Sequence, residues 1–234
     1  MWRFQGNEVE QGERAEAGAE RRWFARPVVP ADGVAAPYRI SPSNAQADWP
    51  DLVMPTVGEI VTLPSGMPLD AKVAEYNVLG DAVHAFFATD VEGLTAEERV
   101  DRARRLLASA GLIGVVRPDA LVEASDRLRA FVDQRWPGAI WHREVAVEAP
   151  VGTAQGERHV AGIIDLLLET ANGYVIFDHK TFPGRSEAAW RTKIVEFLPQ
   201  FAAYAMALRS LGARHVVAGW VHLPVGGGLV EITA

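Results

Sequence analysis

The stretch GIIDLLLETANGYVIFDHKT, residues 162–181, decides the fold. Its apolar residues form two runs on either side of the polar sequence ETANG, a pattern that predicts two antiparallel strands joined by a tight turn. The same runs contain Asp165, Asp178 and Lys180. Charged side chains are rarely buried without a partner or a function. The stretch therefore predicts a site as well as a hairpin.

The position of the turn decides which charged groups face one another. If the turn is centred on the Ala-Asn pair of ETANG, Asp165 lies directly opposite Asp178. If it is centred on the Asn-Gly pair, Asp165 faces Lys180 and Asp178 is its diagonal neighbour. Because strand side chains alternate, both turns gather the three groups on one face, with directly facing Cβ atoms about 5 Å apart. A three-residue loop would move Asp165 to the opposite face.

Two carboxylates held this close repel one another, and burial makes the repulsion more costly. Lys180 supplies one compensating charge, and a divalent cation supplies two. Oxygen ligands suit Mg²⁺ or Mn²⁺, which can polarise a phosphoryl oxygen and acidify a bound water. The predicted chemistry is metal-dependent phosphodiester hydrolysis. The structural alternative is a buried Asp–Lys ion pair with an incidental second carboxylate.

Composition limits the class of protein. The chain has 234 residues, of which 49% are hydrophobic and 23% charged, as expected for a soluble globular protein. It has no cysteine, which excludes disulfides and thiolate metal sites and favours a cytoplasmic location. No apolar run approaches the roughly 18 residues of a membrane span, and no secretion signal is evident. A net charge of −7 argues against a free-standing nucleic-acid binder.

The first 70 residues differ from the rest in proline content. Eight of the 14 prolines lie in residues 27–68, and proline fixes φ and removes a backbone donor. We therefore expect residues 1–70 to form an extended N-terminal arm and residues 71–234 to form the domain.

Apolar periodicity predicts three helices, then strands, then another helix and a closing pair of strands. The expected helices are 74–88, 95–112, 118–136 and 196–212, and the expected strands are 140–150, 158–169, 173–181, 214–224 and 227–234. This order predicts an α/β domain with a mixed sheet flanked by helices. The nucleotide-binding pattern G-x-x-x-x-G-K-[ST] is absent from the sequence.

The hairpin resembles the signature of the PD-(D/E)XK nuclease superfamily, in the form found in the C-terminal nuclease domains of AddA- and RecB-type helicase–nucleases. That form carries G-x-[IV]-D before the turn and D-x-K-T after it. An upstream helix carries G-x-x-x-H, a strand carries an acid, and a downstream helix carries Q-x-x-x-Y. The matching residues are Gly80, His84, Glu144, Gly162, Asp165, Asp178, Lys180, Thr181, Gln200 and Tyr204. The segments RRWFARPVVP and YRISPSNA also resemble the connection between helicase and nuclease.

The resemblance implies a restriction-endonuclease-like core and a metal site. Asp165, Asp178 and a ring nitrogen of His84 would bind Mg²⁺ or Mn²⁺, and the carbonyl of His179 would be a further ligand. The family often has tyrosine where this sequence has His179. Its side chain should point to the face opposite Asp178, so the chemistry need not change.

The remaining roles also follow from the resemblance. Lys180 would be the catalytic lysine, and Glu144 an accessory acid for which Glu148 is an equal rival. Gln200 and Tyr204 share a helix face and would position the site or the DNA backbone. His142, His159, His215 and His222 show no ligand spacing and are assigned structural roles.

The implied function is a magnesium-dependent, exonuclease-type DNase in an AddA-like machine for double-strand-break repair. Motors would deliver a single strand, and an AddB-like subunit would be the partner. Three alternatives stay open: an inactive nuclease-fold module for DNA binding or assembly, a stand-alone or CRISPR-type nuclease, and a sequence-specific restriction enzyme. The missing four-cysteine cluster disfavours the CRISPR type, and the elements around His84 and Gln200 disfavour the restriction enzyme.

Overall fold

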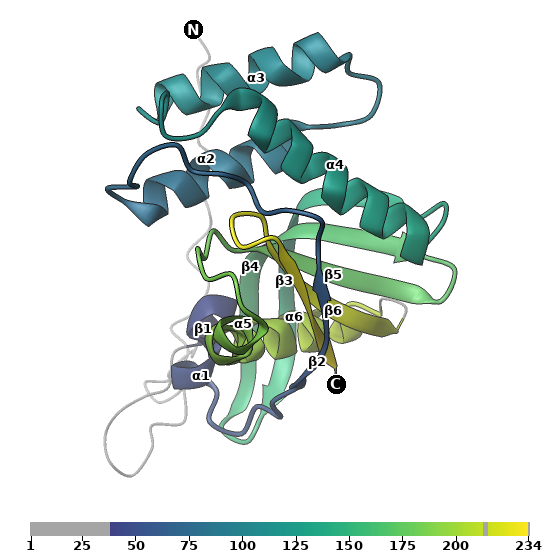
Figure 1. Ribbon diagram of the computed structural model, residues 1–234. Helices are drawn as coiled ribbons and strands as arrows, with labels where there is room; N and C mark the ends of the chain where they lie inside the picture. Colours follow the sequence, from purple (N-terminus) through teal and green to yellow (C-terminus); the bar gives the residue numbers. More distant parts are fainter. Residues whose placement is uncertain (1–37, 213–214, 234) are drawn as a thin grey trace, which may run out of the picture. The chain divides into compact units, whose positions relative to one another are not determined.

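The computed structural model describes residues 38–212 and 215–233. In these residues a seven-stranded mixed sheet lies between two groups of helices (Figure 1). The strands are β1 (Arg39–Ile40), β2 (Thr56–Thr62), β3 (Ile140–Thr153), β4 (Gly156–Thr170), β5 (Gly173–His179), β6 (Val216–Leu223) and β7 (Gly228–Thr233). The α-helices are α1 (Ala45–Asp48), α2 (Tyr76–Thr89), α3 (Ala96–Ser109), α4 (Pro118–Arg135), α5 (Glu187–Ile194) and α6 (Leu198–Ser210), with short 3₁₀ helices η1 (Pro42–Asn44) and η2 (Val195–Phe197).

The sheet is built around β4. The strand order is β1-β4-β5-β6-β7-β2, and β3 pairs with β4 outside this path. β3 covers one edge of β4 along most of its length, while β1 and β5 share the other edge. The β1–β4 and β5–β6 pairs are parallel and the others antiparallel. The predicted mixed α/β architecture is confirmed.

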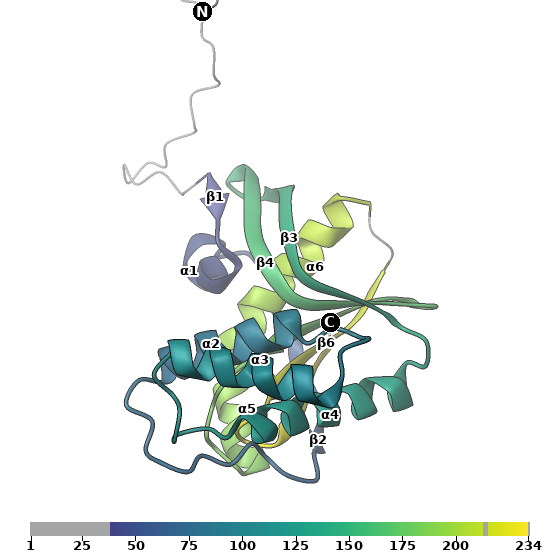
Figure 2. The ribbon, with the colours of Figure 1, turned by 90° about the horizontal axis from the view of Figure 1, so that it is seen from above.

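The central strands are buried on both faces, which explains their continuous apolar sequence. On β5, Ile176 belongs to the core beneath α6, whereas Val175 and Phe177 belong to the core that contains Leu128 and Val132 of α4. The helices α2, α3 and α4 also enclose a small core of their own. Figure 2 shows these three helices together on one side of the sheet.

The β4–β5 turn takes the first of the two registers considered. The pairs run from Leu166↔Phe177 to Thr170↔Gly173, so the Ala-Asn pair forms the turn. Gly173 has φ 135°, and a Cβ there would lie 2.0 Å from the carbonyl oxygen of His215. Only glycine fits this position. Asp165 is therefore the next β4 position beyond the last paired residues, on the side where β5 continues to Asp178.

The β3–β4 hairpin twists sharply at Asp165, so that its two faces change sides of the sheet. Leu166 lies in the core beneath α4, but Ile164, two residues earlier, lies in the core beneath α6. Residues two apart on a regular strand share a face, so the strand must twist sharply between them. On β3 the matching position is Glu144, which has φ 50° in the left-handed region. The curvature of both strands is visible in Figure 2.

Residues 38–70 differ from the expected extended arm. β1 pairs with β4 at Arg39↔His159, and β2 pairs with β7 along the edge of the sheet. The sequence TVGEIVT, which lies between Pro55 and Pro64, explains β2, because its β-branched residues favour a strand. The rest of the expected arm, residues 1–37, lies outside the described residues. In the part of the chain that the structure describes, no helix has the length and apolarity needed to cross a membrane.

Candidate active site

The side chain of Asp178 lies buried at the end of β5, between a lysine and a glutamine. Lys180 Nζ is 2.7 Å from Asp178 Oδ2, and Gln200 Nε2 donates to Asp178 Oδ1 at 2.7 Å. Burial raises the pKa of Asp178; Lys180 opposes this rise, and the nearby Asp165 carboxylate adds to it. One lysine therefore does not fully compensate the buried charge.

Asp165 lies across from Asp178 and is contacted by the His179 backbone and the His84 ring. The backbone N–H of His179 donates to Asp165 Oδ2 at 2.8 Å, and His84 Nδ1 lies 3.4 Å from Oδ1. Burial alone would raise the pKa of Asp165, but the interaction with the His84 ring and the His179 N–H lower it overall. The pKa of Asp165 is thus lowered where that of Asp178 is raised.

His84 on α2 reaches two of the groups that the resemblance assigns to a metal site, Asp165 and the His179 carbonyl. Its Nε2 lies 2.7 Å from the carbonyl oxygen of His179, the geometry of an N–H donating to a carbonyl. Burial lowers the pKa of His84, but the hydrogen bond and charge of Asp165 outweigh burial and raise it. The predicted G-x-x-x-H helix therefore delivers its histidine to the hairpin.

Gln200 and Tyr204 approach the hairpin from α6. The Tyr204 hydroxyl donates to the carbonyl of Ile163, two residues before Asp165. Gly162 makes this approach possible, because a Cβ there would lie 2.9 Å from both the Tyr204 hydroxyl and Pro42 Cδ. Pro199 in the first turn of α6 fixes where the helix begins.

The structure separates the two rival strand acids. Glu144 lies on β3 at the position across from Asp165, between the pairs Arg143↔Leu166 and Val145↔Ile164. Burial and the charge of Asp165 raise its pKa. Glu148 is exposed and lies 3.9 Å from Arg39 in a surface ion pair. Only Glu144 lies beside the predicted site.

The hairpin and α2 border an open hollow of about 420 Å³. Its lining residues are Tyr76, Asn77, Gly80, Asp81, His84, His179, Lys180 and Thr181. A second, mainly apolar hollow of about 250 Å³ lies between α6, β6 and the segment before β2. None of the predicted site residues lines this second hollow, whereas His84, His179 and Lys180 line the first.

One of the comparisons with known proteins shows the family of this chain. The sequence model of the PD-(D/E)XK nuclease superfamily matches residues 58–232. The chain belongs to the PD-(D/E)XK nuclease superfamily. No curated protein matches it. Among solved structures, the crystal structure of SSO0001 is similar at 14% identity and a TM-score of 0.28, covering 67% of this chain and 78% of that one.

PD-(D/E)XK nucleases typically use divalent cations, and the donor set of this member suits one. In residues 38–212 and 215–233, no three His, Asp or Glu side chains already form a ligand cluster. The oxygens of Asp165, Asp178 and the His179 carbonyl are nevertheless the hard ligands that Mg²⁺ prefers. Asp178 Oδ2 is buried and accepts no hydrogen bond of regular geometry; Lys180 Nζ is its ion-pair partner. The donor chemistry therefore fits a divalent cation.

His222, whose spacing predicts only a structural role, contacts the residues of the site. Its Nδ1 lies 3.2 Å from Nδ1 of His179, and both rings pack against Phe87. Burial lowers the pKa of His179 to about 3, so its ring is neutral near pH 7. The backbone carbonyl of His222 also accepts from the Lys180 N–H at 2.9 Å. Only the parallel register of β5 and β6 would have revealed this neighbour.

Proposed function

We propose that this PD-(D/E)XK protein is a magnesium-dependent deoxyribonuclease of the exonuclease type. One observation carries the proposal: Lys180, which lines the hollow of about 420 Å³, holds its Nζ 2.7 Å from the buried carboxylate of Asp178. A second carboxylate, Asp165, lies across the hairpin. This combination suits phosphodiester hydrolysis, because it can hold a divalent cation and a lysine beside the same phosphate.

The metal-binding groups would be Asp165, Asp178, the His179 carbonyl and a ring nitrogen of His84. The cation they hold would polarise the phosphodiester and help to deprotonate water. His84 already contacts both Asp165 and the His179 carbonyl, so α2 fixes the relative positions of these ligands.

The remaining residues act on orientation and charge. Lys180 would stabilise the negative charge that develops on the phosphate oxygens. Its ammonium is already held in place, in a partly buried site. Gln200 holds the Asp178 carboxylate from the opposite side. Tyr204 fixes the backbone at Ile163, and Glu144 is the accessory acid across from Asp165.

We further propose that the domain works within an AddA-like helicase–nuclease in double-strand-break repair in the cytoplasm. The ordered elements from Gly80 to Tyr204 support this context, as do the segments RRWFARPVVP and YRISPSNA. Motors and an AddB-like partner would deliver a single DNA strand to the hollow. The net charge of −7 is consistent with this proposal, because other parts of the complex would bind the DNA and this domain would cleave it.

The test is cleavage of end-labelled single-stranded DNA in Mg²⁺ or Mn²⁺, with EDTA as the metal-free control. Wild type should release short products, and both Asp178→Ala and Lys180→Ala should lose this activity while keeping the fold. Asp101→Ala, a change at a surface acid on α3, is the matched control and should cleave like wild type. Full activity of Asp178→Ala would overturn the site. Metal-dependent DNA binding without cleavage, with and without a helicase partner, would favour the non-catalytic module.

A further inference from the structure

The ammonium of Lys180 is held from two directions. Its Nζ lies 2.7 Å from Asp178 Oδ2 and 4.9 Å from the centre of the Phe197 ring. The Lys180 side chain is only 25% exposed. An ammonium over a ring face is attracted by the negative face of the π-system, more strongly when water is partly excluded.

The local fold explains why Phe197 is available at this point. It is the last residue of η2 and the residue that precedes α6. Gln200, which holds Asp178, follows three positions later in the first turn of α6. The same helix start therefore supplies a ring to the lysine and an amide to its carboxylate partner.

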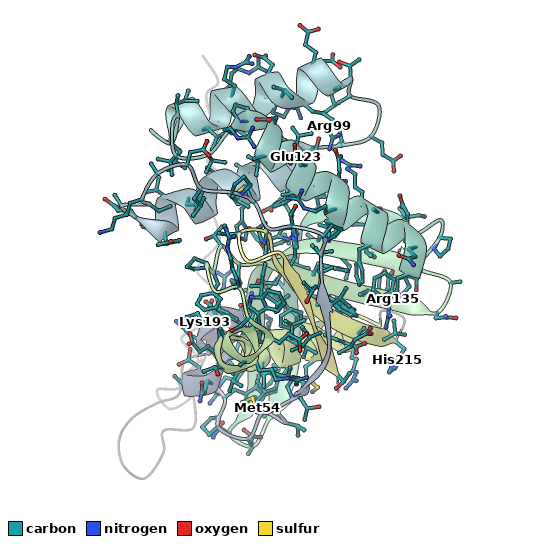
Figure 3. The ribbon with its side chains drawn as sticks, viewed as in Figure 1. Met54, Arg99, Glu123, Arg135, Lys193 and His215 are labelled. Atoms are coloured by element: carbon teal, nitrogen blue, oxygen red, sulfur yellow. The ribbon has the colours of Figure 1, made fainter. Side chains whose placement is uncertain are left out.

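A second lysine approaches the same ring without competing for the carboxylate. Lys193 Nζ lies 5.7 Å from the Phe197 ring centre and 2.7 Å from Glu196 Oε2. Figure 3 shows Lys193 on α5. Because Glu196 offsets the charge of Lys193, repulsion between the two ammonium groups is reduced.

We propose that Phe197 is a positioning residue for the lysine of the site: its ring face holds Lys180 Nζ against Asp178. The effect on cleavage rests on the proposed nuclease function, but the contact itself does not. If the ring face keeps the ammonium in its working position, losing a cation–π interaction of this kind lowers the population of that position, and with it the rate, by about 2- to 30-fold.

The competing explanation is that Phe197 only fills space. It is partly buried against the core beneath α6. Phe197→Leu removes the ring face and keeps an apolar side chain, whereas Phe197→Tyr keeps the ring face. Phe131→Leu is the matched control for loss of a partly buried ring, because Phe131 packs against Trp136 and Trp220, remote from Lys180.

The kinetic experiment measures kcat and KM on single-stranded DNA for these three variants. Phe197→Leu should lower kcat by about 2- to 30-fold with KM nearly unchanged, and Phe197→Tyr should restore most of it. Phe131→Leu should lower the melting temperature and leave kcat unchanged. Equal kcat values for Phe197→Leu and wild type, with wild type active, would overturn the proposal and leave the nuclease function standing.

A second readout is independent of cleavage. Ring currents from Phe197 should shift the ε-methylene protons of Lys180 upfield in NMR spectra, and Phe197→Leu should remove this shift while Phe131→Leu keeps it. If wild type shows the shift but cuts no DNA under any condition, the contact is supported and the proposed function fails. An unshifted Lys180 resonance in wild type would overturn the contact.

Discussion

Two buried aspartates in this protein have opposite electrostatic surroundings. The side chain of Asp90, between α2 and α3, is fully buried and accepts from Arg99 Nε at 2.7 Å and Arg99 Nη2 at 2.8 Å. Arg129 Nη2 lies 3.2 Å away, and Ser125 Oγ donates at 2.6 Å. Burial raises the pKa of Asp90, but these donors outweigh burial and lower it below its ordinary value. Figure 3 shows Arg99 in this helical part.

Asp178 is buried as well, but it has one lysine and a neighbouring carboxylate instead of two arginines. Its pKa is raised where that of Asp90 is lowered. Burial of a carboxylate therefore does not by itself indicate function. The cations around Asp90 favour its charged form, whereas the single lysine beside Asp178 leaves part of its charge uncompensated.

The largest expected effect concerns activity at Asp178. Asp178→Asn should reduce metal-dependent DNA cleavage by at least about 10²-fold, because it removes a charge needed only for chemistry. The melting temperature should stay the same or rise, since the amide oxygen still accepts from Gln200. Kinetics and thermal unfolding on the same samples check this prediction. Normal cleavage by the variant would place the site elsewhere.

The second effect concerns stability at Asp90. Asp90→Asn should lower the free energy of unfolding by about 3 kcal/mol, because it leaves Arg99 and Arg129 without their carboxylate. Chemical denaturation measures this change. Asp101→Asn is the matched control: its ion pairs on α3 are solvent-exposed, so it should change stability by less than about 1 kcal/mol. Equal stability of Asp90→Asn and Asp101→Asn would contradict the stabilising role assigned to Asp90.

The third effect concerns a divalent cation without any substrate. Mg²⁺ or Mn²⁺ at 100 times its Kd should stabilise wild type by about 2.7 kcal/mol, seen as a higher melting temperature. Asp178→Asn should lose most of this stabilisation, and Asp90→Asn should keep it. Sodium chloride at equal ionic strength controls for screening. A cation effect that survives in Asp178→Asn would show that the cation binds elsewhere.

The smallest effect concerns acid stability. A lowered pKa means that Asp90 stabilises the fold above its unfolded pKa, and that this contribution is lost as pH falls through the folded value. The stability difference between wild type and Asp90→Asn should therefore be constant near neutral pH and shrink below about pH 4. The other charged groups around it, Arg129, Arg143 and Asp126 with its partner Arg99, stay in place in both proteins. A difference that grows toward acid pH would contradict the sign.

Much of the arrangement of the candidate site was predictable because its residues follow local spacing rules. The hairpin carries Asp165, Asp178 and Lys180 within one stretch, and either two-residue turn places them together. Helical spacing then puts Gln200 and Tyr204 on one face of α6, where both contact the hairpin. The mixed sheet between helices also follows from the order of periodic segments.

The remaining features depend on long-range packing. At the twist, Glu144 adopts a left-handed backbone conformation. Glutamate rarely adopts this conformation, so the sequence does not indicate the twist. His222 meets His179 only because β6 lies parallel to β5. The strands β1 and β2 were not predicted because of the prolines around them. Composition averaged over 70 residues does not detect short strand segments.

The pairing of β2 with β7 has a consequence for synthesis on the ribosome. Thr56 and Thr233 are hydrogen-bonded although 177 positions separate them, so β2 emerges roughly 9–35 s before its partner at typical translation rates. During that interval its β-branched sequence has no neighbouring strand in this sheet. Glu59 and the register shift between Val57 and Ile60 interrupt the strand and reduce its tendency to pair with other nascent chains. The strand β7 therefore completes a sheet edge whose other strand, β2, left the tunnel well before it.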